Sequence, residues 1–162
     1  MSRLLDEARA GKRKIWYSTI LYSELRPSLL TAGGFKNIEE LIVELEGVLL
    51  PVSPTPPILM RAGRLRDYSF KHHSAQKTEK SRVLTVPDAI QFATCLFVKE
   101  ALGITDIEFH TFDDGKGRNY EEKAVSLLRF EEYAEHCKDD LNIKAVCELA
   151  RMKPALAQSN LT

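Results

Sequence analysis

Apolar and polar residues recur along the chain with periods that predict helices separated by short strands. The clearest helical run begins at the capping-box pair Asn37 and Glu40 and ends near Leu49. Its apolar positions have three- and four-residue spacing: Ile38, Leu41, Ile42, Leu45, Val48 and Leu49. The same criteria predict further helices over 2–11, 19–25, 56–70, 87–102, 130–137 and 140–152.

Turn and capping residues limit these helices. Gly11 and Gly103 are predicted to end two of them, and Ser18 or Thr19 is predicted to cap the helix over 19–25. In the helix over 56–70, the residues expected to face inward are Ile58, Ala62 and Leu65. In the helix over 87–102 they are Ala89, Phe92, Ala93 and Leu96.

Short β-branched and aromatic runs predict strands over 14–18, 49–54, 107–112 and 124–130. Residues 71–81 and 113–119 lack periodicity and are predicted to be loops. Because strands alternate with helices, the pattern indicates an α/β fold, a sandwich with a mainly parallel sheet.

Composition and length limit the class of protein. The chain has 162 residues, 44% hydrophobic and 28% charged, which is typical of one soluble globular domain. Three cysteines without a C-x-x-C pair indicate a reducing compartment. No transmembrane-length apolar run and no signal-peptide pattern occur, so we expect a cytoplasmic protein without a membrane partner.

Charge is balanced overall, with 23 basic and 23 acidic residues, so net charge alone predicts no polyanionic partner. Locally, however, the segment from Arg61 to Arg82 contains seven basic residues and only two acidic ones. This strip is suited to a nucleic-acid backbone, and a solvated loop and helix face is the alternative interpretation. Its candidate RNA-binding residues are Lys71, Lys77, Lys80 and Arg82.

Three acidic residues are candidates for chemistry, because sites in open α/β sheets gather at the carboxyl ends of strands. Glu24 follows the strand over 14–18, Asp88 opens the helix over 87–102, and Asp113 follows the strand over 107–112. Each has an ordinary alternative: a boundary glutamate, a helix cap and a loop-initiating aspartate. Carboxylates gathered at one sheet end would bind Mg²⁺ or Mn²⁺, which can activate water against a phosphodiester.

Other chemistries lack their motifs. The chain has no G-x-x-x-x-G-K-[ST] or G-x-G-x-x-G phosphate loop and no G-x-S-x-G nucleophile motif. The adjacent histidines His72 and His73 have no third metal ligand at a familiar spacing.

Three segments together resemble the PIN-domain family. "IWYSTILYSEL" (15–25) resembles its strand and acidic helix, "LTVPDAIQFATC" (84–95) is similar to its third motif, and "FHTFDD" (109–114) resembles its fourth. The resemblance covers roughly residues 2–131, so we expect a PIN-like domain over 1–131 and a C-terminal helical extension over 132–162 packed on it. It implies a three-layer α/β/α sandwich.

The resemblance also implies roles for individual residues. Many members are Mg²⁺- or Mn²⁺-dependent ribonucleases, and many bacterial ones are toxins of toxin–antitoxin pairs. Glu24, Asp88 and Asp113 would be the second, third and fourth acidic residues, with Asp114 as a substitute for the fourth. Ser18 or Thr19 matches a hydroxyl that would orient a metal ligand.

The family's first motif, a strand ending in aspartate, has no counterpart here, so the PIN-like domain is expected to be truncated at its N-terminus. Without that aspartate we expect weak metal binding and low or no activity. Three explanations are open: a true start upstream of Met1, a degraded or trimmed copy, or a rearranged fold completed by a partner chain.

The leading hypothesis is thus a PIN-type ribonuclease acting on RNA. The alternatives are a non-catalytic PIN-like module that binds RNA or protein, and a structural or antitoxin-binding partner. An antitoxin protein and a second copy of the chain are the candidate protein partners.

Overall fold

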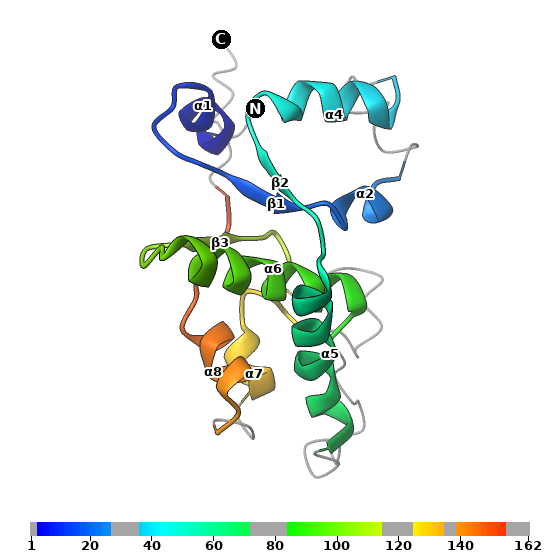
Figure 1. The fold of residues 1–162 in the computed structure, drawn as a ribbon, viewed down its shortest axis with the longest axis vertical. Helices are drawn as coiled ribbons and strands as arrows, with labels where there is room; N and C mark the ends of the chain where they lie inside the picture. The colour runs from blue at the N-terminus through cyan, green and yellow to red at the C-terminus, as the bar shows by residue number, and fades with distance from the viewer. Residues whose placement is uncertain (1–2, 27–35, 72–83, 115–124, 135–138, 155–162) are drawn as a thin grey trace. The chain divides into compact units, whose positions relative to one another are not determined.

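The structure is a computed structural model that describes residues 3–26, 36–71, 84–114, 125–134 and 139–154. The chain divides into two compact units (Figure 1). The first comprises Met1–Ser53 and Pro154–Thr162, and the second comprises Pro54–Lys153. Both contain helices and parallel strands, which confirms the mixed α/β class.

The first unit is built around the parallel pair β1 (Trp16–Ser18) and β2 (Leu50–Val52), in the register Trp16↔Leu50. Three helices accompany it: α1 (Arg3–Arg9), α2 (Leu21–Glu24) and α4 (Ile38–Glu46). These elements confirm the helices and strands predicted over 2–49 and the strand over 49–54.

The start of α4 confirms the predicted capping signal in detail. Asn37 Oδ1 accepts a hydrogen bond from Glu40 N at 2.8 Å. The Glu40 carboxylate accepts from the backbone N–H of Lys36, one residue before the cap, at 2.6 Å. Two backbone donors at the helix start are therefore satisfied, which is the physical basis of the Asn-x-x-Glu pattern.

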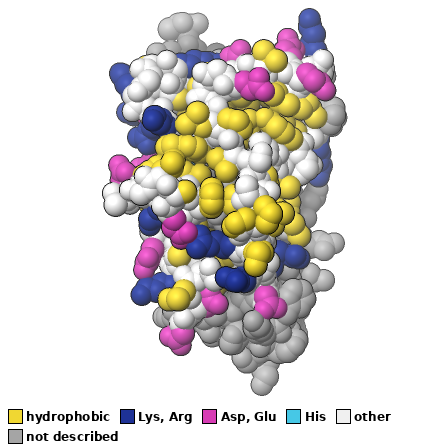
Figure 2. Space-filling model, viewed as in Figure 1, with side chains coloured by type: hydrophobic (Ala, Val, Ile, Leu, Met, Phe, Trp, Pro, Cys, Tyr) yellow, Lys and Arg dark blue, Asp and Glu magenta, His cyan; other side chains and the backbone are white. Residues whose placement is uncertain are grey.

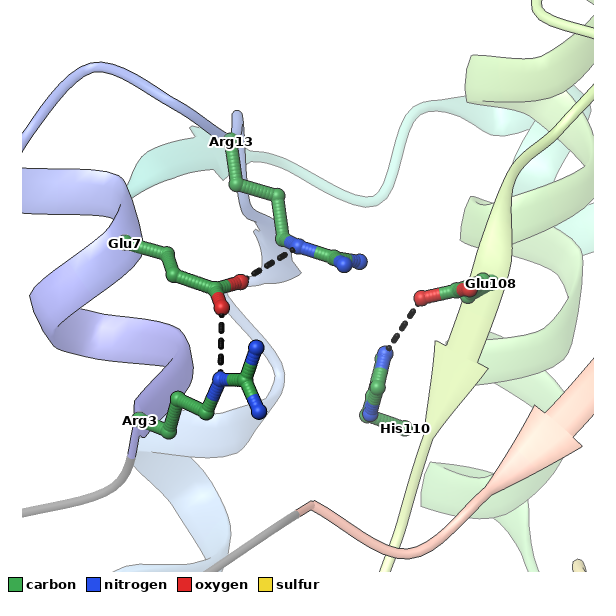
Figure 3. A network of polar contacts seen from close by, with 5 residues as sticks. All are labelled: Arg3, Glu7, Arg13, Glu108 and His110. Carbon is green, nitrogen blue, oxygen red and sulfur yellow. Dashed lines mark hydrogen bonds and ion pairs between the residues drawn. The ribbon is translucent and has the colours of Figure 1, made fainter. Parts of the chain in front are cut away.

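Ion pairs connect the helices of the first unit to its loops. Glu7 on α1 accepts from Arg3 at 2.8 Å and from Arg13 at 2.9 Å (Figure 3). The bond from Arg3 is the largest cause that lowers the pKa of the Glu7 carboxyl. Arg9 contacts Glu44 of α4 at 2.5 Å, so α1 and α4 are joined by charge.

The second unit carries the packed core. Its elements are α5 (Pro56–Lys71), α6 (Val86–Leu102), β3 (Glu108–His110), α7 (Phe130–Ala134), α8 (Leu141–Cys147) and β4 (Ala150–Met152). Helices α5 and α6 pack side by side, and β3 pairs in parallel with β4 (Figure 1). The residues predicted to face inward are all buried: Ile58, Ala62, Leu65, Ala89, Phe92, Ala93 and Leu96.

Helix α6 ends where the sequence predicts. Gly103 has φ +62° and its N–H bonds back to the last turn, an αL cap that favours glycine because a Cβ would be strained there. Gly11, two residues after the end of α1, has φ +68° and adopts the same left-handed conformation.

Three local predictions are wrong. Within the predicted strand over 124–130, the described residues 125–130 do not form a strand: Val125, Ser126 and Leu127 are all buried in an irregular segment, and α7 begins at Phe130. The helix predicted over 140–152 ends at Cys147, and Ala150–Met152 is instead β4. A buried apolar run and a short helix–strand junction have no distinctive period. Pairing with β3 gives Ala150–Met152 its strand conformation, and residues 126–128 instead bond to Asp113.

The third wrong prediction concerns the cap of α2. Its N-cap position is Ile20, without a side-chain cap bond, and neither Ser18 nor Thr19 caps it. The backbone provides the entry turn instead, because Thr19 O accepts from Tyr22 N at 3.1 Å. The predicted loop over 71–81 lies outside the described residues, apart from Lys71, the last residue of α5.

The surface carries interspersed acidic and basic side chains around exposed hydrophobic ones on the face shown in Figure 2. Among the described helices, none is both long and apolar enough to cross a lipid bilayer. Cys95 and Cys147 are free thiols, and Cys137 lies outside the described residues.

The packing of the core predicts that shortening a buried side chain of α6 lowers the free energy of unfolding far more than shortening an exposed one. Phe92→Ala should lower the free energy of unfolding by about 3–5 kcal/mol, because Phe92 is fully buried against two other aromatic rings. Leu102→Ala, at the exposed end of the same helix, should change it by less than about 0.5 kcal/mol. Urea denaturation followed by circular dichroism at 222 nm measures both, and equal losses would contradict this packing.

The buried Cys95 thiol predicts that the stability of the folded protein depends on pH. Burial raises the pKa of the Cys95 thiol to about 11, from an ordinary value of 9.0, while Lys99 opposes the shift. The folded state therefore retains the proton more firmly than the unfolded state. The contribution of the buried, protonated Cys95 thiol to stability is fully present below pH 9.0 and is lost as the pH rises through about 11.

Thiol labelling measures this shift. At pH 8 the Cys95 thiolate is scarce, so Cys95 should react with iodoacetamide far more slowly in the native protein than in urea. Peptide mass mapping identifies the labelled cysteine. Labelling of native Cys95 at the rate of the unfolded chain would show that the thiol is not buried as described.

Candidate functional site

Asp88 lies in the first turn of α6, where Thr85 is the N-cap. The Thr85 hydroxyl accepts from Asp88 N at 3.3 Å and donates to Asp88 Oδ2 at 2.5 Å. One hydroxyl thus satisfies a backbone donor and orients the carboxylate at the same time. Thr85 is thus the cap of α6, and the half-buried Asp88 side chain is held in a defined position by the Thr85 hydroxyl.

Asp113 follows β3 in a segment whose backbone is fixed by several bonds. Its N–H donates to Thr111 Oγ1 at 3.1 Å, and its carbonyl accepts from Leu128 N at 3.2 Å and from the buried Ser126 hydroxyl at 3.4 Å. Asp113 Oδ2 accepts from Leu127 N at 3.4 Å. This bond to the carboxylate comes from a residue 14 positions along the chain, not from the loop's own backbone, and it limits where the carboxylate lies.

Asp88 and Asp113 lie on two segments of the second unit that meet at one aromatic contact. Gly103 ends α6, and β3 then returns along it, because the ring of Phe109 packs on Phe92 with centroids 4.7 Å apart. From this contact Asp88 lies one helical turn, about 6 Å, toward the helix start. Asp113 lies four residues after Phe109, three residues beyond the end of β3.

The Asp114 carboxylate forms an ion pair with a lysine side chain. Lys153, directly after β4, places its Nζ 2.6 Å from Asp114 Oδ2, and Arg129 donates to the Asp114 carbonyl at 3.2 Å. Lys153 and Arg129 were not recognised from the sequence, because Lys153 follows a strand that the local pattern predicted as helix.

The remaining acidic candidate and the two hydroxyls belong to the first unit. Glu24 is the last residue of α2 and is exposed. Ser18 ends β1 and is 8% exposed, and its Oγ finds no hydrogen-bond partner within the described part of the chain. Thr19 donates its backbone N–H to Val52 O at 3.0 Å, which extends the pairing of β1 with β2.

A further polar pair lies on β3. Glu108 and His110 are two residues apart, on the side of the strand opposite Phe109, and His110 Nε2 is 3.1 Å from Glu108 Oε2 (Figure 3). His110 Nδ1 is buried without a hydrogen-bond partner among the residues that the structure describes. The alternation in "IEFHTF" predicts that these two side chains share a face, although the pair was not singled out from it.

The basic strip is described only in part. Arg61 pairs with Glu100 at 2.9 Å and Arg66 donates to the Leu84 carbonyl at 3.2 Å, so both connect α5 to α6 or its lead-in. Of the candidate RNA-binding residues, Lys71 is the last residue of α5, and its side chain is not described. The other three, Lys77, Lys80 and Arg82, lie outside the described residues.

The carboxylate oxygens of Asp88 and Asp113 are of the type that Mg²⁺ and Mn²⁺ prefer. In the ranges that the structure describes, no three His, Cys, Asp or Glu side chains form a group that could hold a metal ion. No protein-family model, no curated protein and no solved structure matches the chain.

Thr85 provides a test of the local geometry. Thr85→Ala should lower the free energy of unfolding by about 1 kcal/mol, because it removes the cap of α6. Thr85→Ser keeps the hydroxyl and should preserve most of that stability. Thermal unfolding of the two variants measures the difference, and equal melting temperatures would show that the hydroxyl contributes nothing.

Proposed function

We propose that this chain is a metal-dependent endoribonuclease of the PIN type that hydrolyses phosphodiester bonds of RNA. Asp88 and Asp113 are the central carboxylates of its site, and Glu24, in the first unit, is the further acidic residue that the resemblance implies. The observation that supports the proposal is the packing of Phe109 on Phe92, with ring centroids 4.7 Å apart, because Asp88 lies four residues before Phe92 and Asp113 four residues after Phe109. Each carboxylate accepts a hydrogen bond that limits its motion.

The chain's own residues supply orientation and charge. Thr85 holds one oxygen of Asp88, and the bonds of residues 126–128 hold the backbone and carboxylate of Asp113. Fixed, partly buried carboxylates lose little side-chain entropy when they ligate a cation. When bound there, Mg²⁺ or Mn²⁺ would lower the pKa of a water molecule and stabilise the leaving oxygen.

The proposal includes a three-layer α/β/α sandwich. Its support is the parallel pairing of β1 with β2 and of β3 with β4, each with helices between the strands in sequence. Parallel strands need covered faces, which is the condition a sandwich provides. The proposed substrate is single-stranded RNA, and an antitoxin protein is the proposed regulatory partner.

Cleavage of a labelled single-stranded RNA in Mn²⁺ tests the function. Asp88→Asn and Asp113→Asn should each lower the rate about 100-fold or more, because a neutral amide is a weaker metal ligand than a carboxylate. Glu24→Gln should act in the same direction. The control is Asp106→Asn, an exposed aspartate between α6 and β3 at the opposite end of the helix, which should leave the rate unchanged.

Two results would contradict the enzyme. One is cleavage that persists in EDTA or is equally fast in all four variants, which would identify a contaminating nuclease. The other is RNA binding without cleavage in the wild-type protein, unchanged by Asp88→Asn or Glu24→Gln. That second result would favour the non-catalytic binding module.

A further inference from the structure

Two cationic side chains from separate elements meet at the acidic loop after β3. The strands β3 and β4 are parallel, and Thr111 N donates to Met152 O at 3.0 Å, so both strands end at the same edge of their sheet. Lys153 therefore emerges beside the loop that carries Asp113 and Asp114. Arg129, just before α7, reaches the same loop from residues 125–130.

The contacts at this edge differ from those of a structural ion pair. Lys153 is 53% exposed and Asp114 is 32% exposed, although their charged atoms are only 2.6 Å apart. By contrast, the nearby Arg151 side chain is 5% exposed and donates to the carbonyls of Val146 and Leu149 while it pairs with Glu131. Arg151 is thus part of the unit's framework, whereas Lys153 is accessible from solvent.

We propose that Lys153 and Arg129 form a binding subsite for the phosphate backbone of single-stranded RNA at the carboxyl edge of β3 and β4. In the free protein Lys153 pairs with Asp114, and on binding it transfers to a phosphate oxygen. This subsite rests on the proposed function, because it lies beside Asp113 and would hold a phosphate next to the carboxylates. Lys153 and Arg129 are both described by the structure, whereas Lys77, Lys80 and Arg82 of the basic strip lie outside the described residues.

The chemistry of the two side chains suits this role. A lysine ammonium is a compact charge on a flexible four-carbon stem, and an exposed ion pair contributes little stability, so exchange of partner is easy. The Arg129 guanidinium presents planar donors that match phosphate oxygens. Without such cations, the adjacent acidic residues Asp113 and Asp114 would repel a polyanion.

The test is equilibrium binding of a fluorescein-labelled single-stranded RNA, measured by anisotropy in EDTA over a series of NaCl concentrations. Lys153→Met should weaken binding roughly 3–10-fold and reduce the slope of log K against log salt by about 0.7, the value for one lost phosphate contact on a single strand. Lys153→Arg keeps the charge and should retain the affinity. The matched control, Lys144→Met on the exposed face of α8, should change neither quantity.

Asp114→Asn distinguishes binding from a purely structural role. If Lys153 transfers to phosphate, removal of its carboxylate partner should tighten RNA binding about 2–5-fold, because a competing negative charge disappears. Unchanged or weaker binding by Asp114→Asn, or a Lys153→Met variant that matches Lys144→Met, overturns the subsite. Circular dichroism confirms folding, and if Lys153→Met does not fold, Asp114→Asn decides.

This assay separates the subsite from the enzymatic proposal, because binding in EDTA needs neither metal nor cleavage. Affinity changes at Lys153 and Asp114 together with absent cleavage would keep the subsite and remove the nuclease. Cleavage that depends on Asp88 and Asp113, with affinity independent of Lys153, would do the reverse.

Discussion

The second unit depends on a chain of aromatic contacts at its centre. Phe92 of α6 packs on Phe109 of β3 with ring centroids 4.7 Å apart and on Phe130 of α7 at 5.0 Å, and Phe130 continues to Tyr133 at 5.4 Å. Tilted and edge-on aromatic pairs stabilise a core beyond their buried area. Because these rings come from three elements separated in sequence, they determine how the chain returns after α6. The segments that carry Asp88 and Asp113 are brought to one contact by that return.

The residues at this end show how a structural and a chemical role can share one side chain. Asp88 is bound by the Thr85 hydroxyl, Asp113 organises residues 126–128, and Asp114 pairs with Lys153. A carboxylate that already accepts one hydrogen bond keeps lone pairs for other ligands and has lost part of its rotational freedom. A carboxylate in local bonding of this kind can therefore still ligate a cation.

The first unit has a different energetic balance. Its helix α4 has apolar residues at regular helical spacing, yet Ile38, Leu41, Ile42 and Leu45 are only half-buried, and Leu49 is the buried hydrophobic residue of this unit among those described. Much of its organisation therefore rests on caps and ion pairs such as Asn37–Glu40 and Arg9–Glu44. Exposed ion pairs are individually weak, so we infer that this unit contributes less to stability than the second.

What the sequence alone determined were features encoded within a few residues. The capping pair at Asn37, the αL glycine at Gly103 and the inward face of α6 follow from short-range hydrogen bonding, backbone sterics and the 3.6-residue period, so they could be predicted correctly. The strand β4, the irregular buried segment at 125–127 and the backbone entry into α2 were decided by the tertiary structure. Three-residue strands have almost no period of their own, and only the partner strand β3 gives Ala150–Met152 its conformation. The candidate site divides in the same way, since Asp88 and Asp113 were singled out from motif and position. Lys153 reaches Asp114 because parallel pairing brings the ends of β3 and β4 to one edge, and Arg129 reaches it from the segment that bonds to Asp113.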